Sequence, residues 1–168
     1  DFEAVQTAAV DAWESELARI KVEMKDPEQK KIFYTAMYHA MIAPMLFSDV
    51  NGDYRGADDQ VYNSDKPRYT CFSLWDTYRA KQPLMTIIHP EKAGDFVATM
   101  VDICDKQGDL PVWHLWGNET DCMVGDPGIP VVADAIVKGI EGFDREAAFE
   151  AIKKTAAVEE RGKEHKIF

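Results

Sequence analysis

The sequence predicts an all-α fold, in which helices follow one another and are joined alternately by short turns and by long, aromatic-rich loops. Apolar residues recur every three or four positions over most of the chain, which is the spacing of one helix face. Two stretches, 45–69 and 109–128, lack this spacing and are longer than a simple connection requires. Such a chain suits helix-on-helix packing, either as a bundle or as part of a helical toroid whose long loops gather at one end.

The length and composition indicate one globular segment and exclude several classes of protein. A chain of 168 residues can bury a sizeable core, and its 46% hydrophobic and 29% charged residues are ordinary globular values. The net charge of −11 disfavours nucleic acid and anionic membranes as partners. The longest apolar run, Ala40–Phe47, is too short to span a bilayer. The three cysteines form neither a disulfide framework nor a zinc motif; they are Cys71, Cys104 and Cys122.

Two helices are expected in the first part of the chain. The first covers residues 2–24, and its apolar positions are Phe2, Val5, Ala9, Trp13, Leu17, Ile20 and Met24. The second begins at Pro27, which suits the first position of a helix, and Asp26 can cap it. Pro44 ends it, because the residue before a proline is driven out of helical geometry.

The first long loop, 45–69, is expected to contain short strands and a β-hairpin. Asn51-Gly52 stands between apolar flanks, which is a strong hairpin signal. Within it, the segment 49–60 matches a calcium-binding loop at its first, third and fifth positions, Asp49, Asn51 and Asp53. However, Tyr54 stands where that loop needs glycine, and Gln60 where it needs glutamate. We interpret it as a polar turn and not as an EF-hand, while a weaker calcium role for one of its carboxylates stays open.

Four further helices are expected in the second part of the chain. They begin at Ser73, at His89-Pro90, at Ile129 and after Asp144. Pro83 should kink or break the first of them, and Gly108 should end the second as a C-terminal cap. Asp144 is the expected N-cap of the last helix, which should run to about Arg161.

The richest group of chemically active side chains lies in the second long loop, at Trp113–Met123. Two tryptophans, a histidine, an amide and two carboxylates occur there between glycines. Indole rings cover the apolar face of a pyranose and polar groups bind its hydroxyls, so the composition suits a sugar site. Glu119 beside indole rings would be partly desolvated, which favours the protonated form that a general acid needs. Alternatively, the tryptophans fill core and Glu119 faces water, which is the better interpretation of this stretch taken alone.

A second group occurs in the stretch 72–79. Ser73 and Asp76 have the spacing to cap a helix reciprocally, which is a structural role. The functional alternative places Trp75 and Asp76 at the rim of a pocket, with Asp76 accepting hydrogen bonds from substrate hydroxyls. Spacing alone favours the cap. The sequence contains no nucleophile elbow, phosphate-binding loop, dinucleotide fingerprint or zinc-protease motif.

Four stretches together resemble the catalytic domain of glycoside hydrolase family 92, the calcium-dependent exo-α-mannosidases. In the order of the family they are FYTAMYHAMIAP at 33–44, FSDVNGDYRG at 47–56, FSLWDTYRAKQPL at 72–84 and GNETDCMVGDPGIPVVADAIVKGI at 117–140. The resemblance extends from Phe33 to about Ile152, which is most of the chain. Four motifs in sequence are specific, and they favour the functional interpretations above.

The resemblance implies roles for individual residues. The glutamate of the GNET motif is the general acid of the family, and it corresponds to Glu119. The Trp-Asp pair of the LWDT motif contributes to the mannose pocket and corresponds to Trp75 and Asp76. Asn118 is carried over as a substrate contact or a neighbour of one, and Trp116 is expected to help hold the terminal mannose.

The resemblance also implies the fold, the reaction and the surroundings. The expected fold is part of an (α/α)6 toroid with a small β-hairpin in a long loop, usually preceded by a β-sandwich domain. The expected reaction releases terminal mannose from α-mannosides, α-1,2-linked and of the N-glycan type, with inversion and with a bound Ca2+. Partners would be mannoside oligosaccharides or glycoprotein glycans. Most such enzymes are bacterial and are secreted, periplasmic or attached to the cell surface.

Finally, the resemblance implies that residues 1–168 carry only part of the site. An inverting glycosidase needs a second carboxylate roughly 6.5–9.5 Å from the first to activate water. In the family, this base and most calcium ligands belong to later motifs, which do not occur before Phe168. The chain is therefore expected to be about half of a catalytic domain, to pack against the remainder and a β-sandwich domain, and to be inactive alone. Two alternatives stay open: a non-catalytic helical carbohydrate-binding or interaction module, and a glycosidase of the same fold acting on another sugar.

Overall fold

The computed structural model describes residues 1–158, and the chain divides into two compact units, Asp1–Ile42 and Ala43–Phe168. The first unit consists of α1 (Phe2–Leu17) and α2 (Pro27–Met41). As expected, Asp26 caps α2 by accepting a hydrogen bond from the Glu28 amide at 2.9 Å. However, α1 ends at Leu17 and not at Met24. Beyond it, the chain is bonded to α2, because the Tyr34 hydroxyl donates to the Ile20 carbonyl at 3.2 Å.

The second unit is built around four helices and one short helical turn. They are α3 (Leu74–Thr77), α4 (Lys81–Ile88), α5 (Pro90–Gln107), α6 (Gly128–Val137) and α7 (Arg145–Ala156). The expected cap residues are confirmed: Gly108 ends α5 with a left-handed φ of 112°, and Asp144 accepts from two amides at the start of α7. The helix expected from Ser73 is interrupted, as Pro83 predicts: α3 ends at Thr77 and α4 begins at Lys81, with Pro83 in its first turn. The part of the last helix expected beyond residue 158 lies outside the described residues.

The core of the second unit lies on the helix α5. Its buried apolar residues are Ala93, Phe96, Val97, Met100, Ile103 and Cys104, which follow the three-to-four spacing of one face. Buried residues of α6 and α7 contribute to the same core, among them Val132 and Ala148. A Cβ atom at Gly94 would lie 1.9 Å from the Glu141 carbonyl oxygen, so the turn before α7 crosses α5 where only glycine fits.

The loops contain more strand structure than the single hairpin that the sequence predicts. The strands are β1 (Met45–Leu46), β2 (Asp53–Arg55), β3 (Val61–Asn63), β4 (Tyr69–Thr70), β5 (Phe72–Ser73), β6 (Trp113–Leu115) and β7 (Asn118–Glu119). They form three small antiparallel sheets, β1–β4, β2–β3 and β5–β6–β7. The predicted hairpin is β2–β3, but its turn is residues 56–60. Asn51-Gly52 forms a separate tight turn before β2, in which the Gly52 amide donates to the Asp49 carbonyl.

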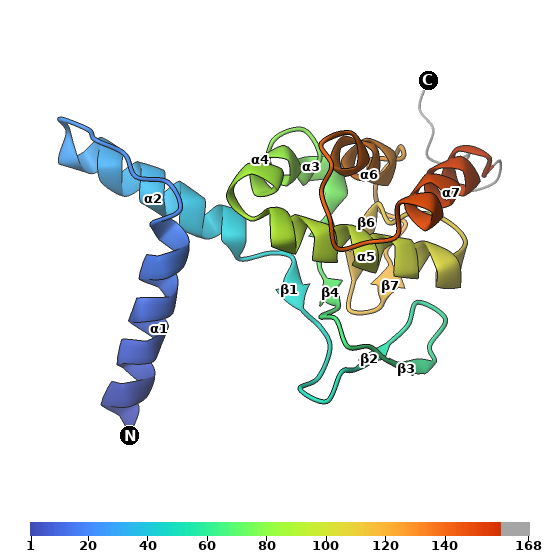
Figure 1. The fold of residues 1–168 in the computed structure, drawn as a ribbon, viewed down its shortest axis with the longest axis horizontal. Coiled ribbons are helices and arrows are strands. Elements are labelled where there is room, and N and C mark those ends of the chain that lie inside the picture. The colour runs from blue at the N-terminus through green and yellow to red at the C-terminus, as the bar shows by residue number, and fades with distance from the viewer. Residues whose placement is uncertain (159–168) are drawn as a thin grey trace. The chain divides into compact units, whose positions relative to one another are not determined.

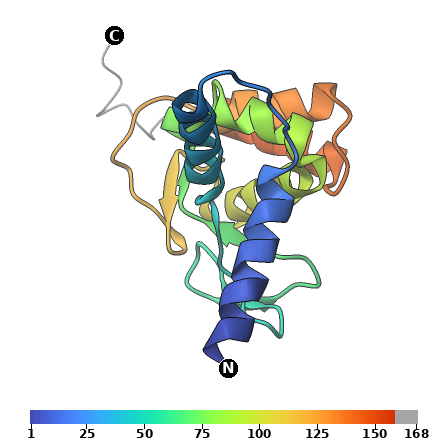
Figure 2. The same ribbon diagram turned by 90° about the vertical axis from the view of Figure 1, so that its left-hand side faces the viewer.

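The arrangement within the second unit separates helices from loop strands. The helix α5 runs between α6 and α7 on one side and the β2–β3 hairpin on the other (Figure 1). The view from the side shows the same separation (Figure 2). The predicted all-α fold class is confirmed, and in the described part of the chain no helix is long and apolar enough to cross a membrane.

Candidate active site

The three-stranded sheet β5–β6–β7 brings two of the sequence motifs together. In this sheet Ser73 of β5 pairs with Trp113 of β6, and His114 of β6 pairs with Glu119 of β7. The helix α3 follows β5 directly, so it starts beside the strands that carry the GNET motif. Trp75 in α3 and Glu119 in β7 therefore belong to one local structure, although they lie far apart in the sequence.

The Glu119 carboxylate is bonded to the backbone on both of its oxygens. Its Oε2 accepts from the Val112 amide at 2.8 Å, and its Oε1 accepts from the amides of Trp113 at 2.9 Å and Thr120 at 3.0 Å. Main-chain donors thus hold this carboxylate, which residue spacing did not indicate. The carboxylate joins β7 to the start of β6.

Asp76 is bonded to the residue that precedes its helix. The Ser73 hydroxyl donates to one oxygen of the Asp76 carboxylate, while the Thr77 hydroxyl donates to the Ser73 carbonyl at 2.7 Å. Neither Ser73 nor Asp76 accepts a hydrogen bond from a backbone amide at the start of α3 through its side chain, so the expected reciprocal cap is wrong. The contact instead holds the Asp76 carboxylate at the protein surface. Trp75 beside it is 37% exposed.

Trp116 and Gly117 form the two-residue turn between β6 and β7. Their φ angles are 50° and 88°, the left-handed values of the tight turns that join antiparallel strands. A bulky side chain in this region strains the backbone. The buried Thr70 hydroxyl accepts from the Trp116 amide at 2.7 Å, and the Arg55 guanidinium donates to the Trp116 carbonyl. The indole is 51% exposed, with its ring 6.4 Å from the Phe47 ring.

His114 lies under this turn and is 2% exposed. Neither ring nitrogen has a hydrogen-bond partner within residues 1–158. Burial lowers the pKa of His114 from 6.5 to about 4, with a further contribution from the positive charge of Arg55. The imidazole is therefore neutral at physiological pH.

The remaining predicted site residue, Asn118, is exposed in β7, where it pairs with Leu115. In the calcium-like segment, Asp53 accepts hydrogen bonds from the side chains of Asn51 and of Asn63 in β3, both at 2.8 Å. Among the described residues, no three His, Cys, Asp or Glu side chains come together in a group that could hold a metal ion.

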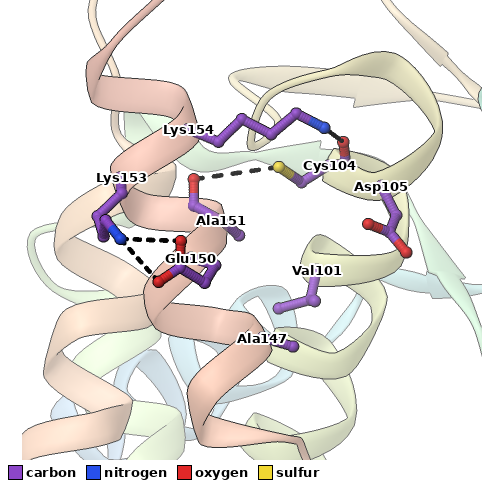
Figure 3. Close-up of a pocket in the computed structure, with 8 residues that line it drawn as sticks. All are labelled: Val101, Cys104, Asp105, Ala147, Glu150, Ala151, Lys153 and Lys154. Atoms are coloured by element: carbon purple, nitrogen blue, oxygen red, sulfur yellow. Dashed lines mark hydrogen bonds and ion pairs between the residues drawn. The ribbon is translucent and has the colours of Figure 1, made fainter.

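Two cavities of the second unit lie away from the candidate residues. One of about 450 Å3 lies between α5 and α7 (Figure 3). Its two lysines are bonded within the protein: Lys153 pairs with Glu150 at 2.7 Å, and Lys154 donates to the Cys104 carbonyl at 3.4 Å. Another of about 410 Å3 lies between the segments 46–52 and 64–67. The side chains of Trp75, Asp76, Trp116 and Asn118 are exposed, and that of Glu119 is partly exposed.

Arg55 and Thr70 were not identified as site residues from the sequence. Arg55 lies in one of the four motifs, FSDVNGDYRG, and membership of that motif was the only available signal. Thr70 has no recognisable signal, because its partner Trp116 is 46 positions away.

The fold and site define a helical domain that presents indole rings and carboxylates on its loops, a combination suited to binding a sugar. A sequence model of the glycosyl hydrolase family 92 catalytic domain matches residues 1–167. The chain therefore belongs to glycosyl hydrolase family 92. No curated protein matches it significantly.

Solved structures of the family agree with this assignment. The α-mannosidase BT3965 from Bacteroides thetaiotaomicron is 39% identical, with a TM-score of 0.92 over 95% of this chain and 22% of its own. The inverting mannosidase BT2199 from the same organism is 30% identical, with a TM-score of 0.85 over 96% of this chain and 22% of its own. The predicted membership and the (α/α)6 fold class are confirmed. The chain spans about a fifth of the length of these relatives.

Proposed function

We propose that the chain is part of an exo-α-mannosidase that releases terminal mannose from α-mannosides. The observation that carries this proposal is the sheet β5–β6–β7, which unites the LWDT and GNET motifs in a fold similar to α-mannosidases over 95% of the chain. One of those structures is a complex of BT3965 with mannoimidazole. We further propose α-1,2-linked N-glycan mannosides as substrates and inversion at the anomeric carbon, as the name of BT2199 indicates for that relative.

In this proposal Glu119 is the general acid that protonates the leaving oxygen. An inverting enzyme needs one carboxyl group in that role. The amides of Val112, Trp113 and Thr120 hold this carboxylate in place between β6 and β7.

The mannose ring is held by the exposed side chains around Glu119. Trp75 and Trp116 offer indole faces to the apolar side of the sugar. Ser73 occupies one oxygen of Asp76, so the other can accept from a sugar hydroxyl. The exposed amide of Asn118 offers both a donor and an acceptor.

The other components of the reaction lie outside this chain in the proposal. The base that activates water, most ligands of Ca2+ and a β-sandwich domain belong to further parts of the same protein. We also propose that the protein is bacterial and acts in the periplasm, at the cell surface or outside the cell.

The test is mannose release from α-1,2-mannobiose by the full-length protein, with Ca2+ and with a chelator. Glu119→Gln should lower kcat/KM by about 10²–10⁴-fold, the usual contribution of a general acid. Glu150→Gln is the matched control, because this surface glutamate in α7 only pairs with Lys153, and it should leave kcat/KM unchanged. Proton NMR of the first product should show β-mannose, as inversion requires. No release by folded, calcium-loaded protein would contradict the proposal.

A carbohydrate-binding module without catalysis is the second candidate, and one observation favours it. Three backbone amides donate hydrogen bonds to the Glu119 carboxylate, which gives it a structural role that does not depend on a reaction. In that case the protein would bind mannosides without cleaving them. Calorimetric titration with α-1,2-mannobiose would then give the same Kd for the wild type and for folded Glu119→Gln.

A further inference from the structure

The Trp116–Gly117 turn needs an external constraint, because its first residue is strained. Both residues have positive φ angles in the left-handed region, and only glycine adopts this conformation without steric cost. The sheet that the turn closes has strands of two or three residues, too short to impose the turn by themselves. Neighbouring groups must therefore stabilise it. One is Thr70, which binds the Trp116 amide.

The second neighbouring group is Arg55, whose guanidinium lies against the turn. One nitrogen donates to the Trp116 carbonyl, and the Arg55 Nε lies 2.9 Å from the point where a Cβ atom on Gly117 would be. A second guanidinium nitrogen is 3.1 Å from the Asp59 carboxylate. The planar fork of arginine allows both contacts at once. Arg55 thus orients the peptide group that joins the two turn residues.

Arg55 is itself anchored to the helical core through its hairpin. The neighbouring Tyr54 donates from its hydroxyl to the Asp102 carboxylate of α5 at 2.9 Å. Lys106 of α5 binds the same carboxylate at 2.5 Å and lies 4.2 Å from the centre of the Tyr62 ring in β3. These contacts join the β2–β3 hairpin to α5 from side chains that are largely buried. A continuous path therefore leads from α5 through the hairpin to the turn.

Arg55 is expected to contribute little to the stability of the fold. Its side chain is 41% exposed, and an exposed ion pair such as that with Asp59 contributes little to stability. Its removal should therefore leave the fold intact and act on the turn. The turn determines where the Trp116 indole points and how β7, which carries Glu119, is placed against β6.

We infer that Arg55 is a positioning residue that holds the Trp116–Gly117 turn in its strained conformation and so places Trp116 and Glu119 for the sugar. This role rests on the proposed function for its effect on catalysis, but its effect on the turn is independent of any reaction. Because its hairpin is bonded to α5, Arg55 fixes the turn relative to α5. In this role Arg55 does not contact the substrate itself.

The test compares Arg55→Ala, Arg55→Lys and Arg145→Ala in the full-length protein. Arg145 is the matched control, since it also donates from an exposed guanidinium to a backbone carbonyl, that of Ile136, at 2.7 Å. Hydrogen–deuterium exchange of the peptide 113–122 reports on the turn, and the kinetics of mannose release report on its function. Arg55→Ala should accelerate exchange in this peptide and lower kcat/KM by roughly tenfold. Arg55→Lys should restore part of both, and Arg145→Ala should change neither.

The outcomes separate the positioning role from the proposed function. Faster exchange in Arg55→Ala together with an inactive wild type would support the role at the turn and reject mannosidase activity. An active wild type whose exchange and kinetics are the same in Arg55→Ala and Arg145→Ala would overturn the inference. Faster exchange with unchanged kinetics would also overturn it, because the turn would then be structural only. Similar melting temperatures of the variants would show that global unfolding does not cause the loss of activity.

Discussion

The helices α4–α7 and the sheet β5–β6–β7 are held together by different interactions. The helices bury apolar side chains at regular spacing, with Met100 and Val132 fully enclosed. The sheet has strands of two or three residues, and single polar contacts stabilise it, such as those of Thr70 and Glu119. Burial of apolar side chains contributes much free energy of folding but does not determine the exact position of single atoms. A hydrogen bond contributes little free energy of folding but does determine the position of the two groups that it joins. Substitutions in the helices should therefore reduce stability, and substitutions around the sheet should reduce activity.

The largest effect on stability is expected from the core of α5. Met100→Ala removes a fully buried side chain and should lower the free energy of unfolding by about 2–5 kcal/mol, through lost burial and the cavity left behind. Hydrogen exchange of the α5 amides measures this change. Met100→Leu nearly conserves volume and should cost less than about 1.5 kcal/mol. If the folded fraction of Met100→Ala lost most of its activity, the division between the two regions would be wrong.

The next largest effect is a pH dependence caused by His114. Burial lowers its folded pKa to about 4, while the unfolded chain titrates near 6.5. Between these values the unfolded state binds a proton that the folded state does not, so stability falls as the pH decreases from 6.5 to 4. The loss is at most about 3.5 kcal/mol, since the pKa values are 6.5 and about 4 and one pKa unit corresponds to about 1.4 kcal/mol.

Thermal unfolding at several pH values between 4 and 7 measures this dependence. His114→Phe removes the titrating group from the same buried position and should flatten the curve in that interval. A wild-type curve that is already flat would show that His114 binds its proton in the folded state.

A smaller effect is expected from Thr70, the buried partner of the Trp116 amide. Thr70→Val keeps the shape but leaves that amide without its acceptor, at a cost of about 1–3 kcal/mol. The change should appear as faster exchange in the peptide 113–122 and as reduced mannose release. Thr70→Ser keeps the hydroxyl and serves as the control. Equal behaviour of the two variants would mean that the hydrogen bond does not hold the turn.

The smallest effect is expected at the start of α7. Asp144→Ala removes the carboxylate that accepts from the amides of Glu146 and Ala147, and should cost about 1 kcal/mol. Asp144→Asn should keep most of the cap. Denaturation curves measure both changes, and mannose release should stay at the wild-type level. A loss of activity larger than the loss of folded protein would connect α7 to the site.

Predictions from the sequence were correct for elements whose ends depend on neighbouring residues. They were wrong or missing where contacts between distant residues determine the structure. The starts of α2 and α7 were predicted correctly, because Asp26 and Asp144 bind amides two or three positions away. The hairpin turn was misplaced, since Asn51-Gly52 has the composition of such a turn but leads into β2 instead. The sheet β5–β6–β7 was not predicted, because strands this short carry no alternating pattern.

For the site, sequence motifs identified which residues matter but not their surroundings. Glu119, Trp75 and Asp76 were selected from their motifs, and the structure brings the segments that carry them together. Their roles in catalysis and binding stay predictions. The amide bonds of Glu119 and the contact between Ser73 and Asp76 could not be foreseen from residue spacing.

The sequence by itself determined the helical fold class, the caps of the main helices and the membership of family 92. These properties follow from the spacing and order of residues along the chain. Only the tertiary structure decided that Arg55 and Thr70 hold the Trp116 turn, and that His114 is buried and neutral. The two contacts with Trp116 join residues 61 and 46 positions apart, so they exist only after the helices have packed and brought the loops together.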